Sequence, residues 1–132
     1  LLHADLETGS RAFRGDGIRP SLRAVAEWEL PNDWSIGVMP GLFVDKNEDG
    51  DRYVGGIAAV VVGKSFTDKL RGFVELAGQQ LASRRHGGNV VTADLGMAYL
   101  LTNSVQVDTA AAWGLSKAAP DFGWTIGLSV RF

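Results

Sequence analysis

The sequence predicts an all-β protein, an antiparallel up-and-down transmembrane β-barrel with eight strands in this chain. Two patterns predict this class: apolar and polar residues alternate over most of the chain, and the connecting segments alternate in length. Composition agrees, because 17 glycines in 132 residues favour sheets with tight turns over helices. A chain of this length is expected to form a single domain, residues 1–132.

The final segment, residues 122–132, alternates without a break. Its apolar face holds Trp124 and every second residue from there to Phe132, and its other face holds glycine, serine, threonine and Arg131. This suits a strand with lipid on one side and a crowded polar lumen on the other. A last strand ending in Phe resembles the terminal strand of bacterial outer-membrane barrels, and it implies recognition of Phe132 by the barrel-assembly machinery.

The connections predict how the strands are arranged. The expected strands cover residues 1–8, 21–30, 34–44, 53–64, 69–81, 89–101, 104–115 and 122–132. Longer and shorter connections alternate between them, and an up-and-down sheet places alternate connections at opposite ends. The long connections are therefore expected to share the outer rim, with the short turns and both termini on the periplasmic side of a bacterial outer membrane.

Aromatic residues fall near the predicted strand ends. They form the expected membrane girdle, with all side chains pointing outward: Trp28, Trp34, Tyr99 and Phe132 at the periplasmic level, and Tyr53, Trp113 and Trp124 at the outer level. Aromatic residues at two levels with aliphatic residues between them are typical of a protein in contact with a lipid bilayer.

The opposite face is charged. The residues expected to line the lumen are Arg23, Glu27, Lys64, Arg71, Glu75, Asp94, Asp108 and Arg131. Acids and bases at period two on one face can pair across strands in a wet interior. The expected strand 53–64 is the ambiguous one, because it is apolar almost throughout. Lys64 is expected to face the lumen, and Val54, Val60 and Val62 lie on the same face of the strand as Lys64. The opposite orientation of this strand remains an alternative.

Composition excludes several classes. The net charge of −2 shows no excess of basic residues of the kind that nucleic-acid binding requires. The absence of cysteine excludes disulfides and thiolate metal sites. The mean hydropathy of +0.03 is too low for a helical membrane protein, whereas transmembrane strands need only half of their residues to be apolar. No cofactor is expected. The start at Leu1 leaves open a mature protein, a trimmed one or a fragment.

Few residues have the spacing of a chemical site. Asp45, Asn47, Asp49 and Asp51 have the spacing that opens a calcium-binding loop, but the twelfth position is Gly56 and lacks the bidentate Glu. An acidic solvated loop is the favoured interpretation, so no metal is expected. No serine, histidine and acid are placed to act together, which argues against an enzyme.

Basic residues in two long connections could meet anionic headgroups of the outer leaflet, including lipopolysaccharide. They are Arg11, Arg14 and Arg19 in the first connection, and Arg84, Arg85 and His86 in a later one. Scattered loop arginines that are merely solvated are the alternative interpretation.

Three parts of the chain carry a family resemblance: Thr8–Ser21, Ala26–Pro31, and the ending formed by Ala118–Asp121 with Gly127–Phe132. Together they resemble the family of the MetA pathway of phenol degradation. The resemblance implies a Gram-negative outer-membrane barrel of transporter or porin type, taking up small hydrophobic or aromatic compounds. The resemblance assigns no function to any particular residue of this chain. Members of that family are typically longer, so the chain would correspond to their C-terminal part.

Two other functions stay open. One is a small barrel, closed by pairing of residues 2–8 with residues 122–132, that serves as a structural anchor or a surface-interaction protein. Eight strands leave an interior that side chains fill, so such a barrel would conduct poorly. The other is a soluble lipocalin-like binding protein.

Overall fold

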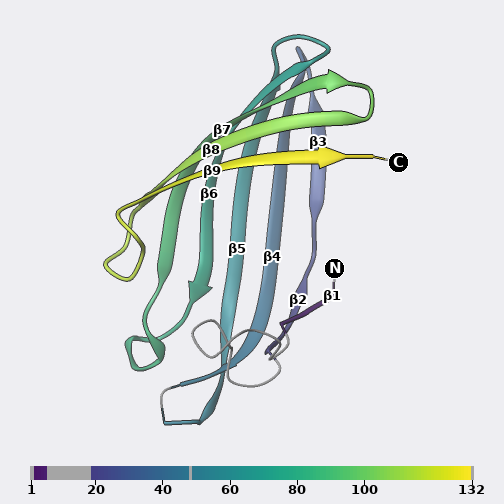
Figure 1. Ribbon diagram of the computed structural model, residues 1–132. Helices are drawn as coiled ribbons and strands as arrows, with labels where there is room; N and C mark the ends of the chain where they lie inside the picture. The colour runs from purple at the N-terminus through teal and green to yellow at the C-terminus, as the bar shows by residue number, and fades with distance from the viewer. Residues whose placement is uncertain (1, 6–18, 48, 132) are drawn as a thin grey trace.

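One curled antiparallel sheet contains every strand of the chain that is described (Figure 1). The computed structural model describes residues 2–5, 19–47 and 49–131. The strands are β1 (Leu2–Asp5), β2 (Arg19–Arg23), β3 (Ala26–Leu30), β4 (Trp34–Lys46), β5 (Arg52–Ser65), β6 (Leu70–Leu81), β7 (Val90–Thr102), β8 (Val105–Gly114) and β9 (Phe122–Val130). A short 3₁₀ helix, η1 (Arg84–His86), lies between β6 and β7. Among these residues, no helix has the length and apolar character needed to cross a membrane.

The sheet order confirms the predicted all-β, up-and-down arrangement. Neighbours run β1-β2-β4-β5-β6-β7-β8-β9, with β3 also paired to β4. The predicted strand 21–30 is present as two pieces, β2 and β3, which keep one continuous register on β4. The sheet therefore has eight strand positions, and it curls into a half-barrel (Figure 1).

The interruption between β2 and β3 lies opposite Pro40. Ala24 donates its N–H to the Pro40 carbonyl at 2.9 Å, but proline has no N–H to donate in return. One bond of the ladder is therefore missing at this point, and regular pairing resumes where Ala26 meets Val38. Proline is tolerated at position 40 because the residues opposite it belong to the irregular link between β2 and β3 and not to a continuous strand.

The two faces of the sheet differ in character. The convex face is apolar and exposed: on β9, Trp124 is 64%, Ile126 is 67% and Leu128 is 67% accessible. The concave face carries small and polar residues, and its best-buried members include Ile57 and Ala77. The alternation predicted for the last strand is thus confirmed through residue 130.

The predicted phase of β5 is wrong. Ile57 and Ala59 are buried on the concave side, at 8% and 9% accessibility, whereas Val54 and Val60 are exposed on the convex side. The register with β4 decides the phase, because Gly41 pairs with Ile57 without any shift along the ladder. A nearly continuous apolar run carries no alternation of its own, so the neighbouring strand sets its orientation.

This reversal moves two predicted site residues to opposite faces. Lys64 shares the convex phase of Val60, and its Nζ lies 5.4 Å from the centre of the Trp34 ring while it donates to the Asn32 carbonyl. Tyr53 shares the concave phase of Ile57. Lys64 therefore does not face inward as predicted, and Tyr53 does not face outward.

The connections lie at the two ends of the sheet as predicted. The longer ones between β4 and β5, β6 and β7, and β8 and β9 share one end, and the tight turns share the other (Figure 1). In the β3–β4 turn, Asn32 and Asp33 both take a left-handed φ of 61°, which asparagine and aspartate tolerate better than other residues with side chains.

The sheet is open within the part of the chain that is described. Its order ends at β1 on one side and β9 on the other, and these two strands are not paired. The pairing of residues 2–8 with 122–132, which a barrel closed by this chain alone would need, is therefore not seen between Leu2–Asp5 and Phe122–Val130.

Two phenylalanine rings cover glycines on the concave face. Phe43 pairs with Gly55, and Phe73 pairs with Gly96. A Cβ at Gly96 would lie 2.4 Å from Phe73 Cζ and 2.9 Å from the carbonyl oxygen of Thr109. The ring fills space that a side chain at position 96 would take, as in other aromatic–glycine pairs across strands.

Alanine in place of Gly96 is expected to destabilise the fold by about 1–3 kcal/mol, the usual cost of overpacking. The Phe73 ring can rotate away, but the Thr109 carbonyl is fixed in the β7–β8 ladder. Gly123→Ala is the matched control, because a Cβ there meets only Ala112 Cβ at 3.9 Å. Urea unfolding of both variants measures the difference, and equal stability would contradict the close packing at Gly96.

Candidate functional site: a pocket on the concave face

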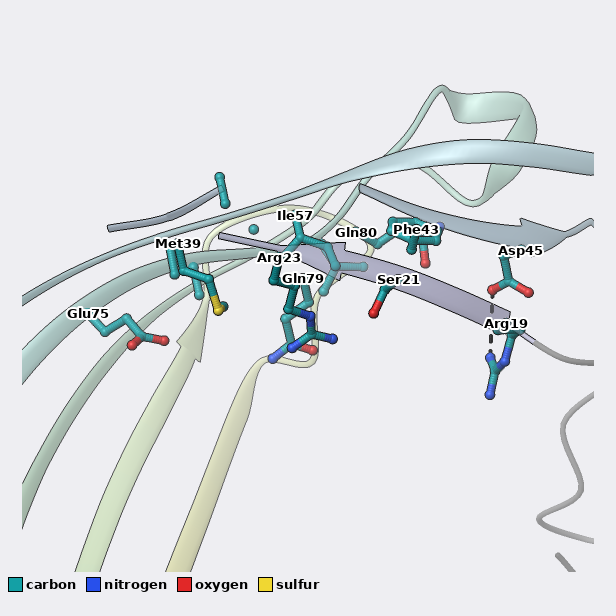
Figure 2. A pocket seen from close by; sticks show the side chains of 15 residues that line it. Arg19, Ser21, Arg23, Met39, Phe43, Asp45, Ile57, Glu75, Gln79 and Gln80 are labelled. Atoms are coloured by element: carbon teal, nitrogen blue, oxygen red, sulfur yellow. Dashed lines mark ion pairs between the residues drawn. The ribbon is translucent and has the colours of Figure 1, made fainter. Parts of the chain in front are cut away.

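A hollow of about 590 Å³ lies on the concave face, between β2, β4, β5 and β6. Its apolar lining includes Met39, Phe43 and Ile57, and its polar lining comes from β2, β4 and β6. Figure 2 shows Glu75 at one end and Arg19 with Asp45 at the other. A hollow with an apolar wall and a few polar groups has the usual character of a small-molecule site.

At the β2 side of the pocket, some polar groups have partners and the hydroxyl of Ser21 has none among the described residues. Arg19 Nη1 lies 3.6 Å from Asp45 Oδ2, and Asp45 Oδ1 accepts from the Lys46 N–H at 2.8 Å. Ser21 is 7% accessible, and its Oγ is buried without a hydrogen-bond partner among the described residues. Buried polar atoms without a protein partner are rare, so Ser21 Oγ is placed to bind water or a polar group of a solute.

A β-bulge in β6 supplies two more polar side chains. Gly78 pairs with Ala58 and Leu81 with Gly56, so β6 holds one residue more than β5 across this interval. The extra residue turns both Gln79 and Gln80 towards the pocket, although consecutive residues normally face opposite sides. Gln80 donates to the His86 carbonyl at 2.7 Å, whereas the Gln79 side chain stays exposed.

Six of the eight predicted lumen residues lie on the strand phase of the concave face: Arg23, Glu27, Arg71, Glu75, Asp94 and Asp108. Arg23 and Glu75 line the pocket itself. Lys64 lies on the convex face, as described above. Arg131 follows β9, where its Nη2 donates to the Asn103 carbonyl at 3.2 Å. The structure therefore brings only part of the predicted set into one site.

Three of the predicted lumen acids, Glu75, Asp94 and Asp108, lie across from residues other than bases. Glu75 lies directly across from Asp94, so two acids face each other on β6 and β7. Asp94 Oδ2 accepts from the Thr92 hydroxyl at 3.3 Å. Asp108 lies across from Gly127, where a Cβ would come within 2.4 Å of its Oδ1. Within the described ranges, Arg71 forms no ion pair with these acids.

The two ends of the concave face carry opposite charge. A hollow of about 580 Å³ at the short-turn end is lined by Glu27, Glu29, Asp33 and a single base, Arg71. At the long-connection end, basic side chains gather around His86. A charged solute moving along this face would therefore meet bases first at one end and acids at the other.

The predicted girdle residues are placed as follows. Trp28, Trp34 and Tyr99 lie on the convex face near the short turns, and Trp113 and Trp124 lie on that face near the long connections. Tyr53 lies on the concave side, stacked on His86 at 4.3 Å. Phe132 lies outside the described residues. Contact of these residues with lipid stays a prediction.

The weak calcium candidate has its oxygens turned to other partners. Asp45 faces Arg19, and Asn47 Oδ1 accepts the N–H of Asp51 at 2.7 Å, which closes the turn. Asp49 and Asp51 are exposed. In the ranges that are described, no group of three or more His, Cys, Asp or Glu could hold a metal ion.

Sequence reasoning missed Ser21, Gln79 and Ile57 as pocket residues. Ser21 looks like any small residue at the start of a strand, and Ile57 lies on the face of β5 opposite to the one that the predicted phase gives it. The Gln79-Gln80 pair carried a usable signal, because two consecutive polar residues interrupt the alternation of β6.

Taken together, the curled sheet, its apolar convex face and its polar concave face define an all-β protein with a barrel-like wall. The chain belongs to the family described as "Putative MetA-pathway of phenol degradation", whose family model matches residues 1–132. This confirms the resemblance seen in the sequence. No curated protein and no solved structure matches the chain significantly.

Proposed function

We propose that the chain forms the wall of an outer-membrane β-barrel of transporter type, which takes up small hydrophobic or aromatic compounds. The observation that carries the proposal is the two-faced sheet. Large apolar side chains on the convex face are not covered by any other described part of the chain, and an exposed apolar surface of this extent is unusual for a soluble monomer. Lipid is the partner that suits it, because the aromatic residues gather towards the strand ends.

The pocket beside Ser21 is the proposed solute site. Its hydrophobic wall of Met39, Phe43 and Ile57 suits a small apolar or aromatic body, and Ser21 Oγ and Gln79 suit a hydroxyl or carbonyl group. The family description supports an aromatic solute, since its name refers to phenol degradation. No catalytic step is proposed for these residues.

The proposed orientation follows from the connections. The long connections would lie outside the cell and the short turns in the periplasm, with both termini on the periplasmic side. Recognition of the C-terminal segment by the barrel-assembly machinery belongs to the same proposal. The alternative of a small self-closed anchor is less well supported, because β1 and β9 are not paired in the described residues.

The tryptophans offer a test of lipid contact that needs no substitution. The chain has four tryptophans, and all of them lie on the convex face: Trp28, Trp34, Trp113 and Trp124. In phospholipid vesicles, lipids brominated near the headgroup are expected to quench their fluorescence strongly, and aqueous acrylamide only weakly. Lipids brominated deep in the chain should quench less, because the rings lie towards the strand ends.

The same protein unfolded in urea provides the control for that experiment. Without bilayer contact, acrylamide should reach all four rings. Full quenching by acrylamide in vesicles, with no effect of brominated lipid, would contradict the membrane location. It would favour the soluble binding protein instead.

A further inference from the structure

A second hollow, of about 430 Å³, lies where the β4–β5 and β6–β7 connections meet. Its lining includes four basic side chains, Lys46, Arg84, Arg85 and His86. Asp49 is the one carboxylate among its described lining residues. The sequence does not place Lys46 beside the other three, since the two connections are far apart along the chain. The structure thus gathers a basic cluster at the long-connection end.

The histidine of this cluster is held in place. Its ring stacks on Tyr53 with the centroids 4.3 Å apart and the planes within 3° of parallel. Its carbonyl accepts from Gln80 at 2.7 Å, and its N–H donates to the Ser83 carbonyl at 2.9 Å. Gly87 follows with a φ of 89°, which turns the chain sharply. The connection is therefore folded around His86, and this reduces the entropy lost when a ligand binds.

Among the described lining residues, Asp49 is the one acid beside Lys46, Arg84 and Arg85, so the bases outnumber the acids there. Asp45, next to Lys46, is directed to Arg19, with 3.6 Å between Nη1 and Oδ2. His86 Nδ1 is buried and has no hydrogen-bond partner among the described residues. Arg84 and Arg85 are exposed, so their guanidinium groups can turn towards a ligand. An anion with several acceptor oxygens would bind these donors together.

We propose that this hollow binds a phosphate group. Two guanidinium groups can each bind phosphate oxygens through a planar fork, and a lysine adds a compact charge. The phosphate could belong to a soluble phosphorylated compound or to a lipid headgroup. Tyr53 places the hollow on the concave side, away from the convex face, so the soluble source is expected. This inference does not depend on transport.

Binding of inorganic phosphate to the full chain in detergent tests the site, with phosphorus-31 line broadening as the readout. Arg84→Gln and Arg85→Gln are each expected to weaken binding about tenfold, the usual effect of losing a charge-assisted hydrogen bond. Lys117→Gln is the matched control. It removes the same charge from an exposed residue in the β8–β9 connection, which does not line the hollow.

A second arm separates the two phosphate sources. Phosphatidylethanolamine vesicles are prepared with intact lipopolysaccharide or with dephosphorylated lipopolysaccharide, and binding of the same variants is compared. Binding only to the intact lipid, lost in Arg84→Gln and Arg85→Gln, supports the site with a lipid phosphate as its ligand. Equal losses with Lys117→Gln, or no dependence on either arginine in both arms, would overturn the proposal. Circular dichroism confirms that each variant is folded.

Discussion

Arginine in place of Ile126 is expected to destabilise the protein in a lipid bilayer by about 2–4 kcal/mol, the cost of a cation on the lipid face near the midplane. Ile126 lies near the middle of β9 and is 67% accessible on the convex face. In water, a substitution at so exposed a position changes the free energy of unfolding by less than about 0.5 kcal/mol. The two environments therefore give clearly different outcomes for the same variant.

The neighbouring residue provides the control for this prediction. Thr125 is exposed on the concave face, so Thr125→Arg adds the same side chain to the same strand with the opposite orientation. Its free energy of unfolding is expected to stay within about 0.5 kcal/mol of the parent protein. Urea unfolding in phospholipid vesicles, followed by tryptophan fluorescence, measures both. A small, equal change in the two variants would show that the convex face does not contact lipid.

Strands β9 and β5 differ in how far their sequence determines which face each residue takes. On β9, polar and apolar residues alternate, so the face of each residue follows from its position alone. On β5, residues from Val54 to Val62 are apolar or glycine, and the predicted phase depends on one charged residue, Lys64. A lysine at a strand end can extend along an apolar surface to the rim, so its charge does not fix the phase.

The pocket could be predicted less well than the fold. Its polar groups come from β2, β4 and β6, and the bulge at Gln79-Gln80 depends on how β6 pairs with both neighbours. The convergence of three strands does not follow from local patterns, and the Gln79-Gln80 pair marks the position of the bulge without showing that it lines a pocket. The break at Ala24–Val25 could have been predicted, because Pro40 cannot donate to the strand beside it.

Tryptophan in place of Gln79 is expected to reduce uptake of a small aromatic compound by about tenfold or more, because an indole ring would occupy much of the solute site. Gln79 is exposed and lines the pocket, so the larger side chain enters open space without overpacking the sheet. Gln106→Trp is the matched control, on the concave phase of β8 but outside the pocket. Uptake into proteoliposomes measures both variants against the parent protein. Equal losses of uptake in the two variants would show that the solute does not pass through this pocket. The absence of ion conductance by the well-folded parent protein in planar bilayers would contradict the channel itself.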